Sequence, residues 1–77
     1  MEPFSMTKDT AVKVFHLEDN DATVVVTTTD TAAPERPPHV AYEQCENEEE
    51  SQAVVQKFVF DLQRQGWTLV DVEQDAE

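Results

Sequence analysis

Basic residues are scarce in this sequence. Five Lys and Arg stand against 17 Asp and Glu, which gives the 77-residue chain a formal net charge of −12. A chain with this charge repels the phosphates of DNA and RNA and the headgroups of an anionic membrane. The imbalance therefore argues against direct binding to nucleic acid or to a membrane, and it predicts that a charged partner is basic.

Cysteine, glycine and long apolar runs are also in short supply. The one cysteine, Cys45, cannot form an internal disulfide, and no stretch has the apolar core of a signal peptide or a membrane-spanning helix. We therefore expect a reducing, cytoplasmic environment. A single glycine and 39% hydrophobic residues indicate a globular domain and not a flexible linker. Because a chain this short buries only about 60% of its unfolded surface, a partner or a second copy would add stability.

Catalytic and metal chemistry has no recognisable motif. Cys45 with His16 or His39 would be the nucleophilic candidates, but no glycine-rich oxyanion loop accompanies them, and the surrounding glutamates disfavour the thiolate that a nucleophile needs. The two histidines and the cysteine lack the paired spacing of zinc ligands, and the run 48–50 lacks the alternating oxygens and the glycine of a calcium loop. We therefore expect no enzymatic activity, no cofactor and no metal.

Two β-branched runs open the regular part of the chain. Residues 11–17 and 22–29 are separated by Asp and Asn residues that favour a turn, so together they predict a hairpin. The expected cross-strand pairs are Leu17 with Ala22, Phe15 with Val24, and Val14 with Val25. Because side chains alternate between the faces of a strand, both faces of this hairpin are partly apolar.

The middle and the end of the chain add two shorter strands. Residues 30–38 contain three of the four prolines and predict a loop, because proline lacks a backbone donor. Residues 39–42 have strand composition and would add a third strand to the hairpin. Residues 67–73 resume a two-residue alternation and predict a final strand.

Between these strands the sequence predicts a helix over residues 48–65. Asn47 is a favoured N-cap residue with Glu50 three positions later, and the acidic first turn suits the helix dipole. Gly66 fits the left-handed position after the helix, with Trp67 following it. The apolar residues of the helix recur at helical spacing on one stripe: Val55, Phe58, Val59 and Leu62.

The elements together predict the α+β class, as a small β-β-(β)-α-β domain in which one helix packs on one face of an antiparallel sheet. We assign residues 7–74 to this single domain. Residues 1–6 are interpreted as a leader or an added segment, because a second methionine stands at position 6. Residues 75–77 are interpreted as a frayed acidic tail.

One helix covers only one face of such a sheet, so the opposite face is left for water, a partner or a second copy. Val12, Val14 and Val25 are expected on this open face. Burying it would supply a substantial share of the stability of so short a chain. We therefore expect a homodimer through the open face.

The outer side of the helix offers a second possible contact surface. Phe60 lies there between Lys57 and Arg64, opposite the apolar stripe. One interpretation is a surface aromatic that is tolerated or covered by a loop or the N-terminal segment. The alternative is a protein contact, for which an aromatic beside arginine is a favoured composition.

The C-terminal residues carry alternating carboxylates. On an extended strand these would line one face at steps of about 6.7 Å, which could imitate a row of phosphates. The alternative is a solvated, fraying terminus. The residues of this acidic surface are Asp71, Glu73, Asp75 and Glu77.

The composition, rich in Asp, Glu, Val and Thr and poor in Lys, resembles that of small acidic proteins of extremely halophilic archaea. The resemblance spans the chain and rests on no motif. It implies that the negative charge maintains solubility in concentrated salt and reports nothing about a ligand.

Two functions remain open. The first is a non-enzymatic acidic protein-binding module or regulator that self-associates. The alternative is a phosphate-mimicking inhibitor of a nucleic-acid-binding protein, of the kind some phages encode. Carboxylates clustered on one surface would favour the inhibitor, and an even spread would favour adaptation to salt.

Overall fold

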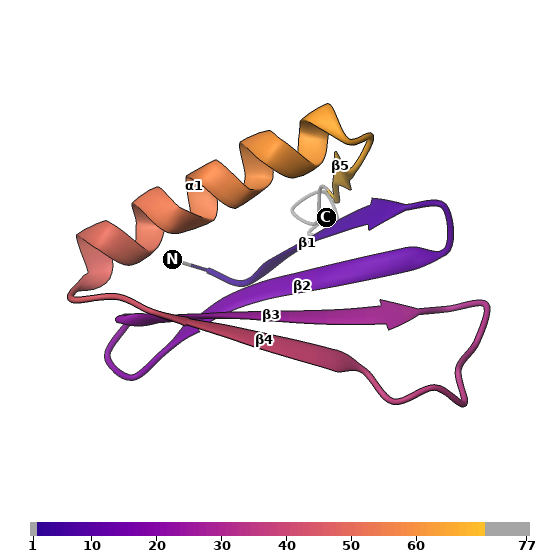
Figure 1. Cartoon of the computed structure of the whole chain (residues 1–77), viewed down its shortest axis with the longest axis horizontal. Coiled ribbons are helices and arrows are strands. Elements are labelled where there is room, and N and C mark those ends of the chain that lie inside the picture. Colours follow the sequence, from indigo (N-terminus) through magenta and orange to yellow (C-terminus); the bar gives the residue numbers. More distant parts are fainter. Residues whose placement is uncertain (1, 71–77) are drawn as a thin grey trace, which may run out of the picture.

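The computed structural model describes residues 2–70, which form one antiparallel sheet with a single helix across one face (Figure 1). The strands lie in the order β4-β3-β2-β1-β5, so β4 and β5 are the edges. The elements are β1 (Phe4–Lys8), β2 (Ala11–Glu18), β3 (Thr23–Asp30), β4 (His39–Gln44), α1 (Glu48–Arg64) and β5 (Thr68–Leu69). The expected α+β class, with one helix on an antiparallel sheet, is confirmed.

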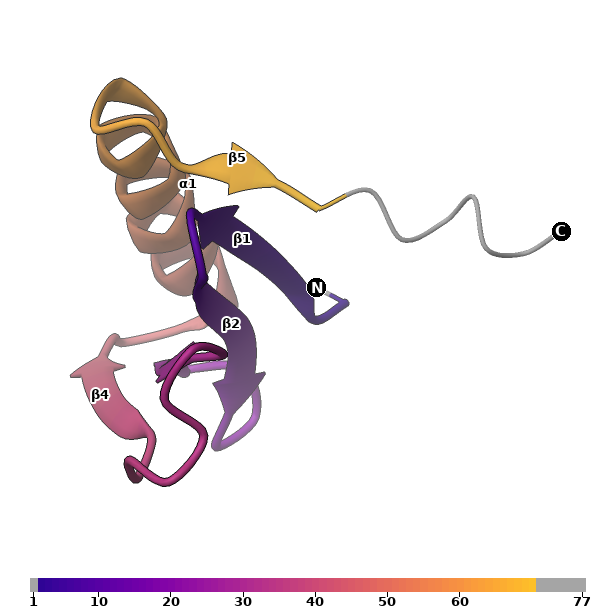
Figure 2. The same ribbon diagram turned by 90° about the vertical axis from the view of Figure 1, so that its right-hand side faces the viewer.

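Phe4, Ser5 and Met6 belong to the fold, so the placement of all of residues 1–6 outside the domain was wrong. Phe4–Lys8 forms β1, which pairs with β2 through a short turn and with β5 on its other side (Figure 2). Burial is the physical reason. Met6 is fully buried, and the ring of Phe4 stacks on that of Phe15 with 4.9 Å between their centroids.

The hairpin of β2 and β3 forms as expected, but its register is shifted by two residues. Phe15 lies opposite Val26 and Val14 opposite Thr27, each two positions further along β3 than the sequence pattern suggested. Because side chains alternate along a strand, a shift of two leaves every side chain on its expected face. Three consecutive turn residues have left-handed φ values of 56°, 58° and 67°: Asp19, Asn20 and Asp21.

Both shorter strands are present with changed lengths. The strand expected over residues 39–42 extends to Gln44 as β4. The strand expected over residues 67–73 is described only as Thr68–Leu69, because residues 71–77 lie outside the described part of the chain. The proline-containing segment connects β3 to β4 as a loop, as predicted.

The start of α1 matches the capping pattern in the sequence. The side-chain oxygen of Asn47 accepts a hydrogen bond of 2.8 Å from the backbone nitrogen of Glu50. In return, the Glu50 carboxylate accepts a hydrogen bond of 2.9 Å from the backbone nitrogen of Glu46, one residue before the cap. These bonds satisfy backbone donors that the first turn of a helix leaves unpaired.

The end of α1 is a Schellman motif, as Gly66 suggested. Gly66 has φ +104°, and its nitrogen donates to the carbonyl of Gln63 at 3.1 Å. The nitrogen of Trp67 donates to the carbonyl of Leu62 at 2.9 Å. This pair of bonds is the signature of the motif, and it turns the chain back toward the sheet to form β5.

The core lies between α1 and the face of the sheet that holds Phe15. Phe15, Met6 and Val24 are fully buried there, and Val55 is 4% exposed on the helix. The Phe58 ring approaches that of Phe15, with 6.5 Å between their centroids. In the part of the chain that the structure describes, no helix has both the length and the apolar character needed to cross a membrane.

Candidate protein-binding surface

The face of the sheet opposite α1, which we call the open face, is nearly free of charge. Its described residues, read from the strand registers, are Ser5, Thr7, Val12, Val14, His16, Glu18, Thr23, Val25, Thr27, Thr29, Val40, Tyr42, Gln44 and Thr68. Glu18 is the one carboxylate among them, and its Oε2 atom lies 2.9 Å from His16 Nε2. In a chain with 17 acidic residues, this face stands out as depleted of negative charge.

Three apolar or aromatic side chains are exposed on the open face, and we call them the open-face patch. They are Val14 at 37%, Val40 at 40% and Tyr42 at 66% relative exposure. Val40 and Val14 flank Thr27 in one row across β4, β3 and β2. An exposed apolar group without nearby carboxylates is a feature of protein contact surfaces, in which tyrosine is a favoured residue.

The structure changes the residues expected on this face. Val14 is exposed as expected, and Val12 is half-buried. Val25 is only 2% exposed, so its place in the expected contact surface was wrong. Val25 lies on an inner strand between His16 and Tyr42, and its burial leaves it little surface for a partner.

Val40 and Tyr42 are exposed open-face residues that the sequence reasoning missed. They alternate with Ala41 in β4, and the alternation in "HVAYEQ" was the available signal. Strand composition alone could not show that β4 is an edge strand, all of whose residues are exposed.

The outer side of α1 is less coherent than its sequence spacing suggested. Phe60 is 59% exposed, and the Arg64 guanidinium carbon lies 5.8 Å from its ring centroid. Lys57 instead borders a separate hollow of about 250 Å³ together with Glu43 and Asp61. The structure therefore brings Phe60 and Arg64 together and places Lys57 on the other flank of the helix.

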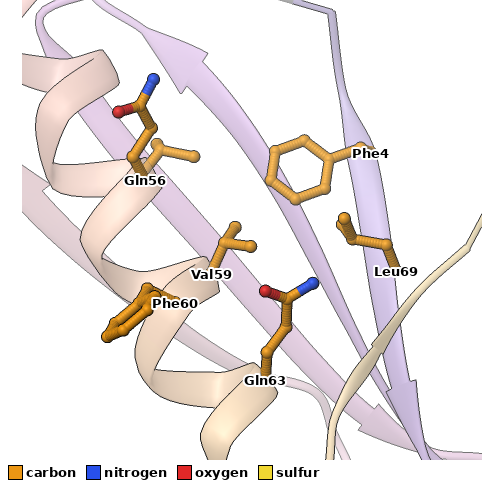
Figure 3. A pocket seen from close by; sticks show the side chains of 7 residues that line it. Phe4, Gln56, Val59, Phe60, Gln63 and Leu69 are labelled. Atoms are coloured by element: carbon orange, nitrogen blue, oxygen red, sulfur yellow. The ribbon is translucent and has the colours of Figure 1, made fainter.

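A groove of about 480 Å³ runs between α1 and the edge formed by β1 and β5 (Figure 3). Phe4, Val59 and Leu69 contribute apolar walls to it. Two helix residues, Gln56 and Gln63, add amide groups. The ring of Phe60 also borders the groove but is turned away from Phe4 and Leu69 in Figure 3. The groove is uncharged and could accept an apolar side chain.

Carboxylates gather at one end of the sheet, which we call the acidic end. The β2–β3 turn and the segment between β4 and α1 meet there, because Cys45 N donates to Ala22 O at 2.7 Å (Figure 1). The acidic end consists of Glu18, Asp19, Asp21, Glu43, Glu46, Glu48, Glu49 and Glu50. Lys8, Arg36 and Arg64 lie toward the opposite end of the sheet or helix. Asp9, Asp30 and Glu35 also lie toward that opposite end, so it is mixed in charge, whereas residues 18–22 and 43–50 contain no Lys or Arg. The predicted acidic surface of Asp71, Glu73, Asp75 and Glu77 lies outside the described residues.

The possible catalytic residues are not brought together. His16 is engaged with Glu18 on the open face. His39 begins β4 and Cys45 follows its end, so about 20 Å of extended strand separates them. Within residues 2–70 no group of three His, Cys, Asp or Glu side chains is arranged to hold a metal ion.

No protein-family model, no curated protein and no solved structure matches this chain.

Proposed function

We propose that this chain is a non-enzymatic, acidic protein-binding module that acts through the open-face patch, and that its first partner is a second copy of itself. The supporting observation is a sheet face that no element of residues 2–70 covers, which exposes Val14, Val40 and Tyr42 and has one described carboxylate, in a chain of net charge −12. Charge elsewhere keeps the chain soluble. Its near absence from this face removes the main local obstacle to contact between two acidic copies.

The size and the charge of the chain indicate how strong the dimer would be and how it would depend on salt. A single small core gives a chain of this length limited stability, so burying the open-face patch would add a useful increment. Two copies of charge −12 repel each other through solvent, and salt screens that repulsion. Dimerisation should therefore strengthen as ionic strength rises. We place this activity in the cytoplasm, because Cys45 has no second cysteine in the sequence to pair with.

Sedimentation equilibrium over a concentration series, at low and at molar NaCl, tests the proposal. Tyr42→Lys adds a charge at a side chain that is 66% exposed, so it should leave the monomer folded and abolish self-association. Phe60→Lys is the matched control, because Phe60 is 59% exposed on the other side of the molecule and should not affect the dimer. A wild-type monomer at high protein and high salt would contradict self-association and move the binding surface to Phe60 and Arg64.

The acidic end favours a second candidate function, a phosphate-mimicking inhibitor of a nucleic-acid-binding protein. Its carboxylates are clustered and not evenly spread, which is the arrangement that mimicry requires. Competition with duplex DNA for a basic DNA-binding protein would test this. Replacing Glu46, Glu48 and Glu49 with glutamine should abolish competition, whereas the same number of changes at Asp9, Glu35 and Asp61 should not. Equal effects of the two sets would indicate general charge and not a site.

A further inference from the structure

Strand β4 has an unpaired outer side. Within residues 2–70 it pairs only with β3, and all of its residues are exposed. Cys45 N donates to Ala22 O, and bonded residues alternate in an antiparallel ladder, so the odd-numbered residues of β4 bond to β3. The backbone N–H and C=O groups of Val40, Tyr42 and Gln44 therefore point away from the sheet.

Edge strands are commonly protected from pairing with another chain by lysine, proline, a bulge or very short length. β4 lacks most of these features. The pairing of β4 with β3 is continuous from His39 to Gln44, and the strand contains neither lysine nor proline. Pro37 and Pro38 stand just before it and limit its length without interrupting it. The opposite edge, β5, is described over only two residues.

The sequence of β4 is complementary to itself when two copies run antiparallel about Ala41. His39 then lies opposite the partner's Glu43 on the helix side, where the imidazole can donate to the carboxylate. Val40 lies opposite the partner's Tyr42 on the open face, as an apolar cross-strand pair. The side chains of His39 and Glu43 have no hydrogen-bond or ion-pair partner among the described residues of their own chain, so they are available for this contact.

We propose that two copies join by antiparallel pairing of their β4 strands about Ala41, which makes one continuous sheet. The inference rests on the self-association proposed above, and it places the contact along the β4 edge, through Val40 and Tyr42 of the open-face patch, with Val14 outside the contact. In this register the outward backbone groups of Val40 face those of the partner's Tyr42, so the two edges satisfy each other. The open faces of both copies become one surface, on which Val14 stays exposed for another protein.

The charge distribution fits this orientation. The two-fold axis passes through the middle of β4, so the acidic ends of the two copies point in opposite directions. Each acidic end lies alongside the partner's β3–β4 loop, in which Arg36 and Glu35 leave no net charge. The arrangement keeps the largest carboxylate groups of the two copies apart.

A pair of variants at one position isolates the backbone contribution. Tyr42→Ala removes the side chain, and Tyr42→Pro removes the side chain and also an outward N–H that β3 does not use. Both should fold, which far-ultraviolet circular dichroism checks. By sedimentation equilibrium we expect Tyr42→Pro to weaken the dimer at least about tenfold beyond Tyr42→Ala, because each proline deletes a backbone bond and two copies are present. Equal dissociation constants would overturn strand pairing.

A charge exchange tests the register independently of proline. His39→Glu and Glu43→Lys should each weaken the dimer by about three- to tenfold, and the double variant should return it close to wild type, because the cross-strand pair is restored with its signs reversed. A double variant that is as weak as the single variants would overturn the Ala41-centred register.

Val14→Lys distinguishes strand pairing from face-to-face packing of the open-face patch. Strand pairing leaves Val14, on β2, outside the contact and predicts a wild-type dissociation constant, whereas packing of the patch predicts loss of the dimer. Loss of the dimer in Val14→Lys, with retention in Tyr42→Pro, would put the second copy on the open face and overturn strand pairing alone. A wild-type monomer at all concentrations and salts would overturn both proposals.

Discussion

The covered face and the open face of the sheet are made by the same strands but carry different side chains. On the covered face, Met6, Phe15 and Val24 are fully buried under α1. On the open face, valine and threonine predominate, and Glu18 is the one carboxylate among the described residues. Hydrophobic burial explains the first face. The second lacks a covering element in the described chain and has fewer carboxylates than the acidic end, which is the basis of the proposed contact surface.

Two adjacent residues of β2 test this comparison with the largest expected effect on stability, because Phe15 and Val14 point to opposite faces. Phe15→Ala should lower the free energy of unfolding by about 3–5 kcal/mol, since it empties a fully buried site between Phe4 and Phe58. Val14→Ala, at a side chain that is 37% exposed, should cost less than about 1 kcal/mol. Urea unfolding at low protein concentration measures both. Similar losses would mean that the two faces are equally packed.

The turn at the end of α1 returns the chain to the sheet as β5, and this connection holds α1 over the covered face. Gly66→Val should cost about 1–2 kcal/mol, because φ +104° is strained for any side chain and worst for a β-branched one. A Cβ atom there would meet Lys8 Cε at an ordinary 3.5 Å, so the loss belongs to the backbone. Gln65→Val, with φ −90°, is the control and should be nearly neutral. An unchanged thermal midpoint in Gly66→Val would contradict the C-cap assignment.

The side of α1 that packs against the covered face contains a local defect. Ser51 is fully buried, and its hydroxyl oxygen has no hydrogen-bond partner within the described residues. Ser51→Ala should therefore raise the free energy of unfolding by about 1 kcal/mol, through loss of a buried unpaired hydroxyl and a gain in helix propensity. The difference in stability between Gln56→Ser and Gln56→Ala, at an exposed helix position, measures the propensity part alone. If it equals the gain of Ser51→Ala, the Ser51 hydroxyl carries no penalty.

The parts of this fold that local chemistry determines could be predicted from the sequence. Asn47 and Gly66 bound α1, and alternation placed Phe15 and Val14 on opposite faces even though the hairpin register was displaced by two. The β1 strand was missed because a second methionine, at position 6, suggested a start, although the spacing of Phe4 and Met6 was strand-like.

The candidate surface was harder to predict, because it depends on contacts between distant segments. Val25 is buried by neighbours on two other strands, and Tyr42 is exposed because β4 is an edge. The acidic end joins residues 18–21 to residues 43–50 across the Cys45–Ala22 bond, a proximity that spacing along the chain does not contain. An open apolar face was predicted because one helix can cover only one of the two faces of a sheet. Only the structure shows which residues are exposed on that face.

We expect the smallest change in stability at the end of the sheet opposite the acidic end, away from the core and from the open-face patch. The hydrogen bond of 2.7 Å from Thr10 Oγ1, followed by that from Ala32 N, holds the pKa of Asp30 below its ordinary 3.8. A lowered pKa in the folded state stabilises the protein above the unfolded pKa, and this contribution is lost as the pH falls through the folded pKa. Thr10→Val should therefore raise the pKa of Asp30 and slightly lower stability at neutral pH, with the difference vanishing in acid.

Carboxyl titration by NMR checks this directly, with Thr31→Val as the control. The Thr31 hydroxyl donates to the carbonyl of Thr10 at 2.9 Å and not to the carboxylate, so its loss should leave the titration of Asp30 unchanged. If the two variants shift the Asp30 pKa equally, the geometry of the whole turn, and not the Thr10 hydroxyl, lowers it. A shift in Thr10→Val alone would show that the hydroxyl of Thr10 lowers the pKa of the Asp30 carboxyl.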